Sequence, residues 1–168
     1  SKGYSLSFDQ RFWKRTVDLL IAVPLTILLS PIMLLVAFAI KCCDRGPVFY
    51  RQVRCTKDNR EFSILKFRSM IVDAEKSGEA VLAKEHDERI TPVGRFLRAV
   101  RLDELPQLFN VLSGDMSLVG PRPERPEIIA EYQKEMPEFV FRTRVKAGVT
   151  GFAQIYGKYN TVPYDKLK

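Results

Sequence analysis

The chain has 168 residues, 46% hydrophobic and 28% charged, a balance that is typical of one folded domain and argues against a disordered segment. Because 27 Lys and Arg outnumber 20 Asp and Glu, the formal charge is +7, and we expect an anionic partner: nucleic acid, a phospholipid surface or a phosphorylated substrate. The three cysteines, Cys42, Cys43 and Cys55, are odd in number and lack C-x-x-C spacing. This argues against a disulfide framework or a zinc site and predicts reduced cytoplasmic thiols.

An apolar segment lies near the start of the chain. Leu19–Ile40 contains 22 residues without a charge, which is long enough for a transmembrane helix. Basic residues flank it on both sides: Arg11, Lys14 and Arg15 before it, and Lys41, Arg45, Arg51 and Arg54 after it. Since the cytoplasmic flanks of membrane segments carry the excess of Lys and Arg, this symmetry predicts that both ends lie on the cytoplasmic face.

Ser30 and Pro31 lie at the midpoint of this segment. Pro31 removes the N–H that would bond to the carbonyl of Ile27, so we predict a kink or break there. Each half of the segment would be roughly 14–16 Å long, about half of a hydrocarbon core roughly 30 Å thick. A re-entrant helix-break-helix therefore accounts for the length, the flanks and the proline. A kinked spanning helix and a buried soluble hairpin are the alternatives.

The remaining sequence predicts a soluble α+β fold in which helix predominates. Val48–Arg54 and Phe62–Met70 flank the polar turn TKDN and predict a β-hairpin. A surface helix and loop are expected within Ile71–Asp87. Further helices are predicted at Val93–Val100 after Thr91-Pro92, from the N-cap Asp103 to the stop at Gly114, at Pro126–Glu135 and at Pro137–Val145.

Adjacent acids mark the strongest candidate site. Asp103 and Glu104 are predicted to open a helix just after Arg95, Arg98 and Arg101. Free N–H groups and the helix dipole would keep Asp103 ionised and could hold a phosphate beside it. An ionised aspartate among arginines is a plausible phosphoryl acceptor, and Glu104 could hold a hard divalent cation. The alternative is an ordinary N-cap with acids in its first turn.

Two basic segments accompany these acids. KFRSM places Lys66 and Arg68 on a predicted strand, where the alternative is a cationic edge of the hairpin. Arg122 lies between Pro121 and Pro123, and a Pro-x-Pro segment is stiff enough to hold its central side chain in one direction. The alternative here is a rigid connector.

Together these segments resemble the catalytic domain of the bacterial monotopic phosphoglycosyl transferases, the polyprenyl-phosphate sugar-1-phosphate transferases. The resemblance runs through FWKRTVDLL, LLSP, PVFYRQVR, KFRSM, RITPVGRFLRAVRLDELPQLFNVLSGDMSLVGPRPE and VKAGVTGFAQIYG, which is essentially the whole chain. It implies a re-entrant membrane helix and a small catalytic domain on the cytoplasmic face of the bacterial inner membrane. It also implies dependence on Mg²⁺ and transfer of a sugar-1-phosphate from a UDP-sugar to undecaprenyl phosphate with release of UMP, the first membrane step of glycoconjugate or exopolysaccharide assembly.

The resemblance also implies roles for individual residues. Asp103 is similar to the nucleophile that forms an aspartyl-phosphosugar intermediate, Glu104 is its acidic partner, and both would lie at the metal. Phosphate or nucleotide binding is implied for Arg98, Lys66, Arg68, Pro121, Arg122, Pro123, Glu124 and Lys146. Ser30-Pro31 matches the family's helix break.

Two departures bear on this transfer of roles. Where many members read R/K-P-G-I-T-G, this chain reads KAGVTG, so the cation remains at Lys146 while the rigid proline is lost. Family members also continue beyond this point, and larger ones carry transmembrane helices upstream. We therefore expect residues 8–41 to form the membrane helix and residues 42–168 the catalytic domain, truncated at its C-terminal end, of a larger protein.

Two other functions were compared with the enzyme. A nucleic-acid-binding module would need its basic residues on one surface with stacking aromatics, whereas Trp13 and many Phe lie in apolar runs, so no nucleic-acid partner is expected. A non-catalytic membrane scaffold could use the same helix and charge. Release of UMP from a UDP-sugar and a lipid phosphate distinguishes the enzyme from the scaffold.

Overall fold

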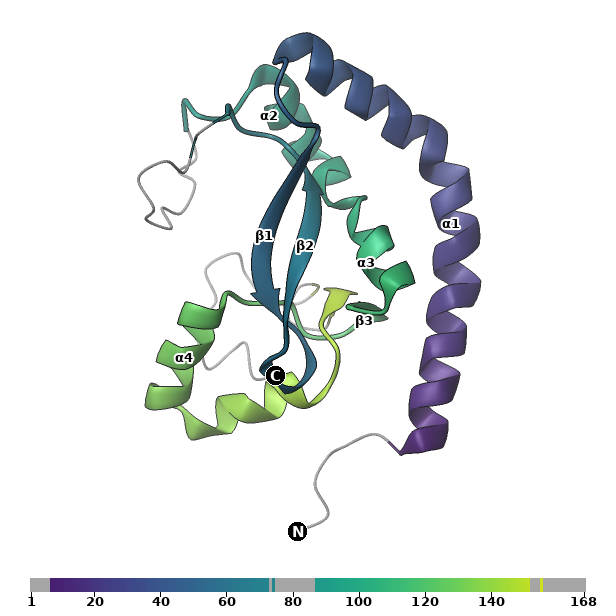
Figure 1. Cartoon of the computed structure of the whole chain (residues 1–168), viewed down its shortest axis with the longest axis vertical. Helices are drawn as coiled ribbons and strands as arrows, with labels where there is room; N and C mark the ends of the chain where they lie inside the picture. Colours follow the sequence, from purple (N-terminus) through teal and green to yellow (C-terminus); the bar gives the residue numbers. More distant parts are fainter. Residues whose placement is uncertain (1–6, 73, 75–86, 152–154, 156–168) are drawn as a thin grey trace. The chain divides into compact units, whose positions relative to one another are not determined.

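The computed structural model describes residues 7–72, 74, 87–151 and 155, and Figure 1 labels its main elements. The α-helices are α1 (Phe8–Cys43), α2 (Pro92–Ala99), α3 (Gln107–Ser113) and α4 (Pro126–Glu135). The strands are β1 (Phe49–Cys55), β2 (Glu61–Phe67), β3 (Ser117–Val119) and β4 (Gly148–Thr150), and the 3₁₀ segments are η1 (Lys57–Asn59), η2 (Leu102–Glu104) and η3 (Pro137–Arg144). Helix predominates over small two-stranded sheets in these ranges, which confirms the mainly helical α+β class.

Local signals in the sequence located several elements well. The predicted hairpin is confirmed, because β1 and β2 pair in one sheet (Figure 1), but β2 ends at Phe67 and leaves Arg68 outside the strand. Helix α2 begins after Thr91, whose Oγ1 accepts a hydrogen bond from the Gly94 N–H at 2.9 Å. Helix α4 has the predicted bounds, and the predicted helix after it is the 3₁₀ segment η3. The helix and loop expected within Ile71–Asp87 fall mostly outside the described residues.

Helix α1 differs from the prediction at Ser30 and Pro31. We predicted a kink or a break there; no break is present, because α1 continues through both residues as one helix of 36 residues (Figure 1). Pro31 cannot donate to the carbonyl of Ile27, but a long helix keeps its hydrogen bonds in the turns on either side of such a residue. The proline is therefore accommodated within the helix.

Many apolar side chains on the surface of α1 are exposed. By length and composition the helix could cross a membrane, and 17% of its most apolar 18-residue window is buried inside the structure. Leu28, Leu34 and Phe38 are each 70–72% exposed. A run of large exposed apolar side chains on one helix is typical of a membrane or partner surface, so α1 is a candidate for contact with lipid.

Contacts group the chain into two compact units. The first unit contains Ser1–Ile27, Gln52–Ile64 and Gln107–Lys168, and the second contains Leu28–Arg51 and Leu65–Pro106. Helix α1 and the hairpin therefore contribute residues to both.

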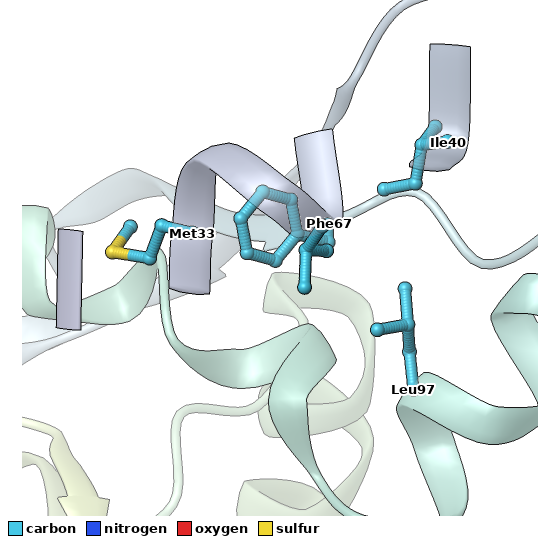
Figure 2. Close-up of a cluster of buried hydrophobic side chains, with 5 residues drawn as sticks. Met33, Ile40, Phe67 and Leu97 are labelled. Carbon is cyan, nitrogen blue, oxygen red and sulfur yellow. The ribbon is translucent and has the colours of Figure 1, made fainter. Parts of the chain in front are cut away.

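The core of the second unit joins α1 to the end of β2 and to α2. Met33, Val36 and Ile40 lie on one face of α1 and are buried, as their spacing of three and four residues requires. They pack with Phe67 and Leu97, which are 1% and 2% exposed (Figure 2). This cluster anchors the C-terminal half of α1 to the segments that carry Lys66 and Arg98.

A parallel strand pair organises the first unit, and the sequence analysis did not predict it. Ser117 pairs with Gly148 and Val119 with Thr150. A side chain at Gly148 would place its Cβ 2.1 Å from the backbone nitrogen of Gly120, so only glycine permits this approach. The pair brings the segment that follows β3 next to the segment around β4.

Asp18 joins the N-terminal half of α1 to this strand pair. Its buried carboxylate accepts hydrogen bonds from the Ser117 hydroxyl at 2.7 and 3.0 Å and from the Leu118 N–H at 3.0 Å. On the preceding turn, Arg15 donates to the carbonyls of Val111 and Leu112 at the end of α3. Charged residues of α1 therefore fix β3 and α3 within the first unit.

Candidate active site

The paired acids lie in a 3₁₀ turn of the second unit, which corrects the prediction that Asp103 is a helix N-cap. Helix α3 begins only at Gln107, while Asp103 and Glu104 belong to η2. Pro106 has no N–H to offer the carbonyl of Leu102, so the regular α-helical pattern cannot run through it. The N–H of Leu105 bonds to Leu102 instead, at 3.2 Å.

Asp103 is half-buried, and burial raises the pKa of its carboxyl group. The positive charge of Lys66 lowers this pKa, Glu104 raises it, and Arg98 lowers it. The predicted helix terminus, which would have favoured ionisation, is absent here. Basic side chains from two other elements instead provide the opposing effect, and the net direction is upward.

Glu104 forms an ion pair with the strand residue Lys66. Their Oε1 and Nζ atoms are 2.9 Å apart, and the side chains are 18% and 21% exposed. This contact brings KFRSM and the DE pair together, although Lys66 and Glu104 are 38 positions apart in the sequence. A partly buried pair with this geometry is held more firmly than a surface ion pair.

Arg98 also belongs to this cluster, since its charge acts on Asp103. Its Nε donates a hydrogen bond to the Ser69 hydroxyl at 2.8 Å. Arg68 lies in the same unit but turns elsewhere: its buried guanidinium bonds to the Asp44 carbonyl at 2.8 Å and lies 3.3 Å from the Asp44 carboxylate. Contacts within the unit therefore link Lys66 and Arg98, but not Arg68, to the acids.

We tested whether the acids could hold a divalent cation. The described residues contain no group of three or more His, Cys, Asp or Glu side chains that could bind a metal by themselves. Mg²⁺, however, usually keeps several waters and binds through one or two carboxylates together with substrate phosphates. Asp103 and Glu104 fit that kind of incomplete site.

The remaining predicted binding residues lie in the first unit. We call Pro121–Glu124 the PRPE segment. Its backbone is fixed because its carbonyls accept hydrogen bonds from the Gly148 N–H at 2.9 Å, from Arg142 at 3.1 Å, from Arg54 at 3.3 Å and from the Cys55 N–H at 2.9 Å. The Arg122 side chain is exposed, whereas Glu124 is buried. The exposed Arg122 side chain therefore extends from a backbone that hydrogen bonds hold in place.

A shallow hollow borders the PRPE segment. Thr56, Phe139 and Arg142 contribute to its lining, together with Pro121, Arg122, Pro123 and Glu124. Burial lowers the pKa of Arg142, Glu124 raises it and Arg122 lowers it. Two guanidinium groups and apolar side chains thus meet on one surface, which suits a ligand with both anionic and planar parts.

Lys146 is half-buried near the end of α3. Burial lowers the pKa of its ammonium group, as do the charges of Arg15 and Arg60, while Asp18 and Asp115 raise it. A cation that is partly desolvated beside other cations gains most from an anionic ligand.

Sequence reasoning missed Ser69 and Arg142. Ser69 lies in the recognised motif KFRSM and Arg142 in a predicted helix, but their contacts cross between elements and leave no periodic signal. Ser69 follows Lys66 and Arg68 in KFRSM, and nothing in the sequence distinguishes its hydroxyl from that of a surface serine. The contact of Arg98 on α2 with a buried hydroxyl in the segment after β2 can be found only from the fold.

The family model described as bacterial sugar transferase matches residues 9–168, so the chain belongs to the bacterial sugar transferase family. It is 47% identical over 148 residues to a UDP-N-acetylgalactosamine-undecaprenyl-phosphate N-acetylgalactosaminephosphotransferase of Aeromonas hydrophila, covering 88% of this chain and 35% of the relative. It is 45% identical over 145 residues to a UDP-glucose:undecaprenyl-phosphate glucose-1-phosphate transferase of Klebsiella pneumoniae, covering 86% and 31%.

A third relative carries another sugar in its name. The chain is 38% identical over 171 residues to an undecaprenyl-phosphate galactose phosphotransferase of Salmonella typhimurium, covering 94% of this chain and 35% of the relative. The chain spans about a third of the length of these three relatives. Their names share undecaprenyl phosphate and differ in the sugar.

Proposed function

We propose that this chain is the catalytic part of a phosphoglycosyl transferase, which transfers a sugar-1-phosphate from a UDP-sugar to undecaprenyl phosphate and releases UMP. The observation that carries the proposal is the cluster around Asp103, a half-buried carboxylate acted on by Lys66, Glu104 and Arg98 in a member of the bacterial sugar transferase family. The names of the relatives support the lipid acceptor and the nucleotide-sugar donor.

The first step is an attack by a carboxylate oxygen of Asp103 on the sugar-linked phosphorus of the UDP-sugar. An acyl phosphate bond forms, the phosphoanhydride bond to UMP breaks, and its electron pair leaves with UMP. Arg98 contacts the phosphate and stabilises the charge that accumulates on it. The raised pKa of Asp103 supports this role, because a more basic carboxylate is a stronger nucleophile once it is ionised.

In the second step an oxygen of the lipid phosphate attacks the same phosphorus. The acyl phosphate bond breaks, polyprenyl diphosphate sugar forms, and the carboxylate of Asp103 is restored. Two steps avoid the direct approach of one anionic substrate to the other. Asp103 and Glu104 would hold Mg²⁺, which would neutralise phosphate charge when bound.

Arg122 and Lys146 are the residues assigned to nucleotide binding in this proposal. Arg122 projects from a backbone fixed by hydrogen bonds, and the partly desolvated Lys146 favours an anion. The KAGVTG loop lacks the usual proline, but the Gly148 N–H still bonds to the Pro121 carbonyl. That contact supports the PRPE segment without the missing ring.

Helix α1 places the reaction at a membrane in the same proposal. Its apolar surface enters the inner membrane, and the basic flanks at both ends favour a re-entrant path with the catalytic part on the cytoplasmic face. Because α1 is helical through Pro31, the path would turn at a proline bend within the helix. Lipid phosphate then meets the enzyme at the interface where its headgroup lies.

Intact-protein mass spectrometry tests the covalent step. We expect the protein, incubated with a UDP-sugar and Mg²⁺ but no lipid acceptor, to gain the mass of one sugar phosphate and release one equivalent of UMP. Asp103→Asn should give neither, whereas Asp58→Asn, which alters an exposed turn carboxylate in a conformation that asparagine tolerates, should behave as wild type. An adduct that survives Asp103→Asn would show that the nucleophile is another residue.

A further inference from the structure

Ser69 connects the strand that carries Lys66 to the helix that carries Arg98. It is 7% exposed, and its hydroxyl accepts a hydrogen bond from Arg98 Nε at 2.8 Å. Its carbonyl accepts from the Thr91 N–H at 3.1 Å, directly before α2. The hydroxyl and the carbonyl of Ser69 are therefore engaged with α2 and with the residue that caps it.

The contact requires a close approach between the two elements. A side chain at Gly94 would place its Cβ 1.9 Å from the Ser69 carbonyl oxygen, so glycine is needed at this point of α2. Gly94 and Arg98 are four residues apart and share one face of the helix. The face that lies against Ser69 is thus the face from which Arg98 extends.

The atom that Ser69 engages determines what remains for a ligand. An arginine carries one N–H at Nε and four at its terminal nitrogens, all fixed in one plane. When Nε bonds to a buried hydroxyl, that plane is held in one orientation. In the part of the chain that the structure describes, the terminal nitrogens of Arg98 make no hydrogen bond, while the charge acts on Asp103. The plane of the guanidinium is therefore fixed, and its terminal nitrogens can still donate hydrogen bonds to a phosphate.

We propose that Ser69 is a positioning residue, which orients the guanidinium of Arg98 toward the phosphate that reacts at Asp103. This inference rests on the proposed transferase function. Orientation matters because a charge-assisted contact contributes most when it needs no rearrangement as charge develops in the transition state. The hydroxyl itself does not touch the substrate.

Removing the hydroxyl should impair catalysis more than donor binding. We expect Ser69→Ala to lower kcat/KM for the UDP-sugar about 10- to 100-fold, the range that corresponds to one hydrogen bond to a charged group. Most of the loss should lie in kcat. Ser69→Thr keeps the hydroxyl and should recover most of the activity. Ser63→Ala is the matched control, because it removes an exposed hydroxyl from β2 without a hydrogen bond in the described structure, and it should behave as wild type.

A double-mutant cycle with Arg98→Lys separates positioning from a structural role. Lysine has no Nε–H in the arginine position, so the Ser69 hydroxyl has no guanidinium to orient. We expect Arg98→Lys to lower UMP release about 100-fold and Ser69→Ala to add less than twofold in that background. Thermal unfolding of each variant shows whether the protein remains folded.

The outcomes distinguish the inference from the proposed function. If Ser69→Ala lowers activity by the same factor with arginine or lysine at position 98, or has no effect on the arginine protein, the positioning role is overturned. If Ser69→Thr is folded but as impaired as Ser69→Ala, the hydroxyl is not the operative group. If wild type releases no UMP, or Arg98→Lys leaves UMP release unchanged, the fault lies in the proposed function or in the role assigned to Arg98.

Discussion

The two charges beside Asp103 should shift the pH dependence of the proposed transfer reaction in opposite directions. Protonated Asp103 cannot attack phosphorus, so kcat/KM falls as the pH drops through its pKa. Burial raises this pKa, and the fall should begin at a higher pH than an ordinary aspartate would give. Lys66→Met removes a charge that lowers the pKa of Asp103, so the acidic limb should move to higher pH. Glu104→Gln removes a charge that raises it, so the limb should move to lower pH.

The size of the coupling follows from the ion pair between these neighbours. Charges 2.9 Å apart attract with about 6 kcal/mol at an effective dielectric constant of about 20, and desolvation offsets much of this. Since both side chains are about one-fifth exposed, we expect each single variant to lower the free energy of unfolding by about 1–3 kcal/mol. The double variant Lys66→Met/Glu104→Gln should lose less than the sum, because neither partner is left alone.

The assay is release of UMP across a pH series, at donor concentrations well below KM, with thermal unfolding at each pH as the stability control. The double variant should have an acidic limb between those of the single variants, although its plateau is lower. If both single variants move the limb in the same direction, or neither moves it, then the group that titrates is not Asp103 as this structure surrounds it.

Two further predictions concern the apolar helix α1 and the nucleotide. In a cysteine-free background, Ser7→Cys and Lys134→Cys should both resist an impermeant external thiol reagent in intact cells. Pro31→Leu removes a helix penalty of roughly 3 kcal/mol, so it should favour a spanning helix and expose one of the two cysteines to the reagent. Labelling of either site without Pro31→Leu would contradict the re-entrant path. Arg122→Ala should raise KM for the UDP-sugar about tenfold and leave membrane association unchanged. The control is Lys134→Ala, which removes an exposed cation from α4 and should leave this KM unchanged. Equal donor kinetics in the two variants would remove Arg122 from the site.

Elements that depend on neighbouring residues could be predicted from the sequence. Thr91-Pro92 predicts the start of α2, and Gly114, with a φ of +91°, follows the end of α3. Helix α4 begins at Pro126 and ends shortly before Pro137. Caps, prolines and glycines act within one or two turns of the chain, so their effects can be read directly. The motif resemblance likewise located the acids and the basic segments, because it needs only the order of residues.

The environment of the site was decided by tertiary contacts. The sequence predicted Asp103 as a helix cap, but Pro106 confines it to a 3₁₀ turn, and burial then dominates its pKa. Arg68 was predicted to bind phosphate or nucleotide together with Lys66, but in the folded chain its guanidinium forms an ion pair with Asp44.

The short parallel strands β3 and β4 show the same limit. Three-residue strands carry too little periodicity to be recognised, and their pairing depends on Gly148 approaching Gly120 from a distant part of the chain. The contact between Ser69 and Arg98 is of this kind as well. Residue order determines which chemical groups the protein has, whereas burial and orientation depend on which distant segments pack together, and only the folded chain brings those segments into contact.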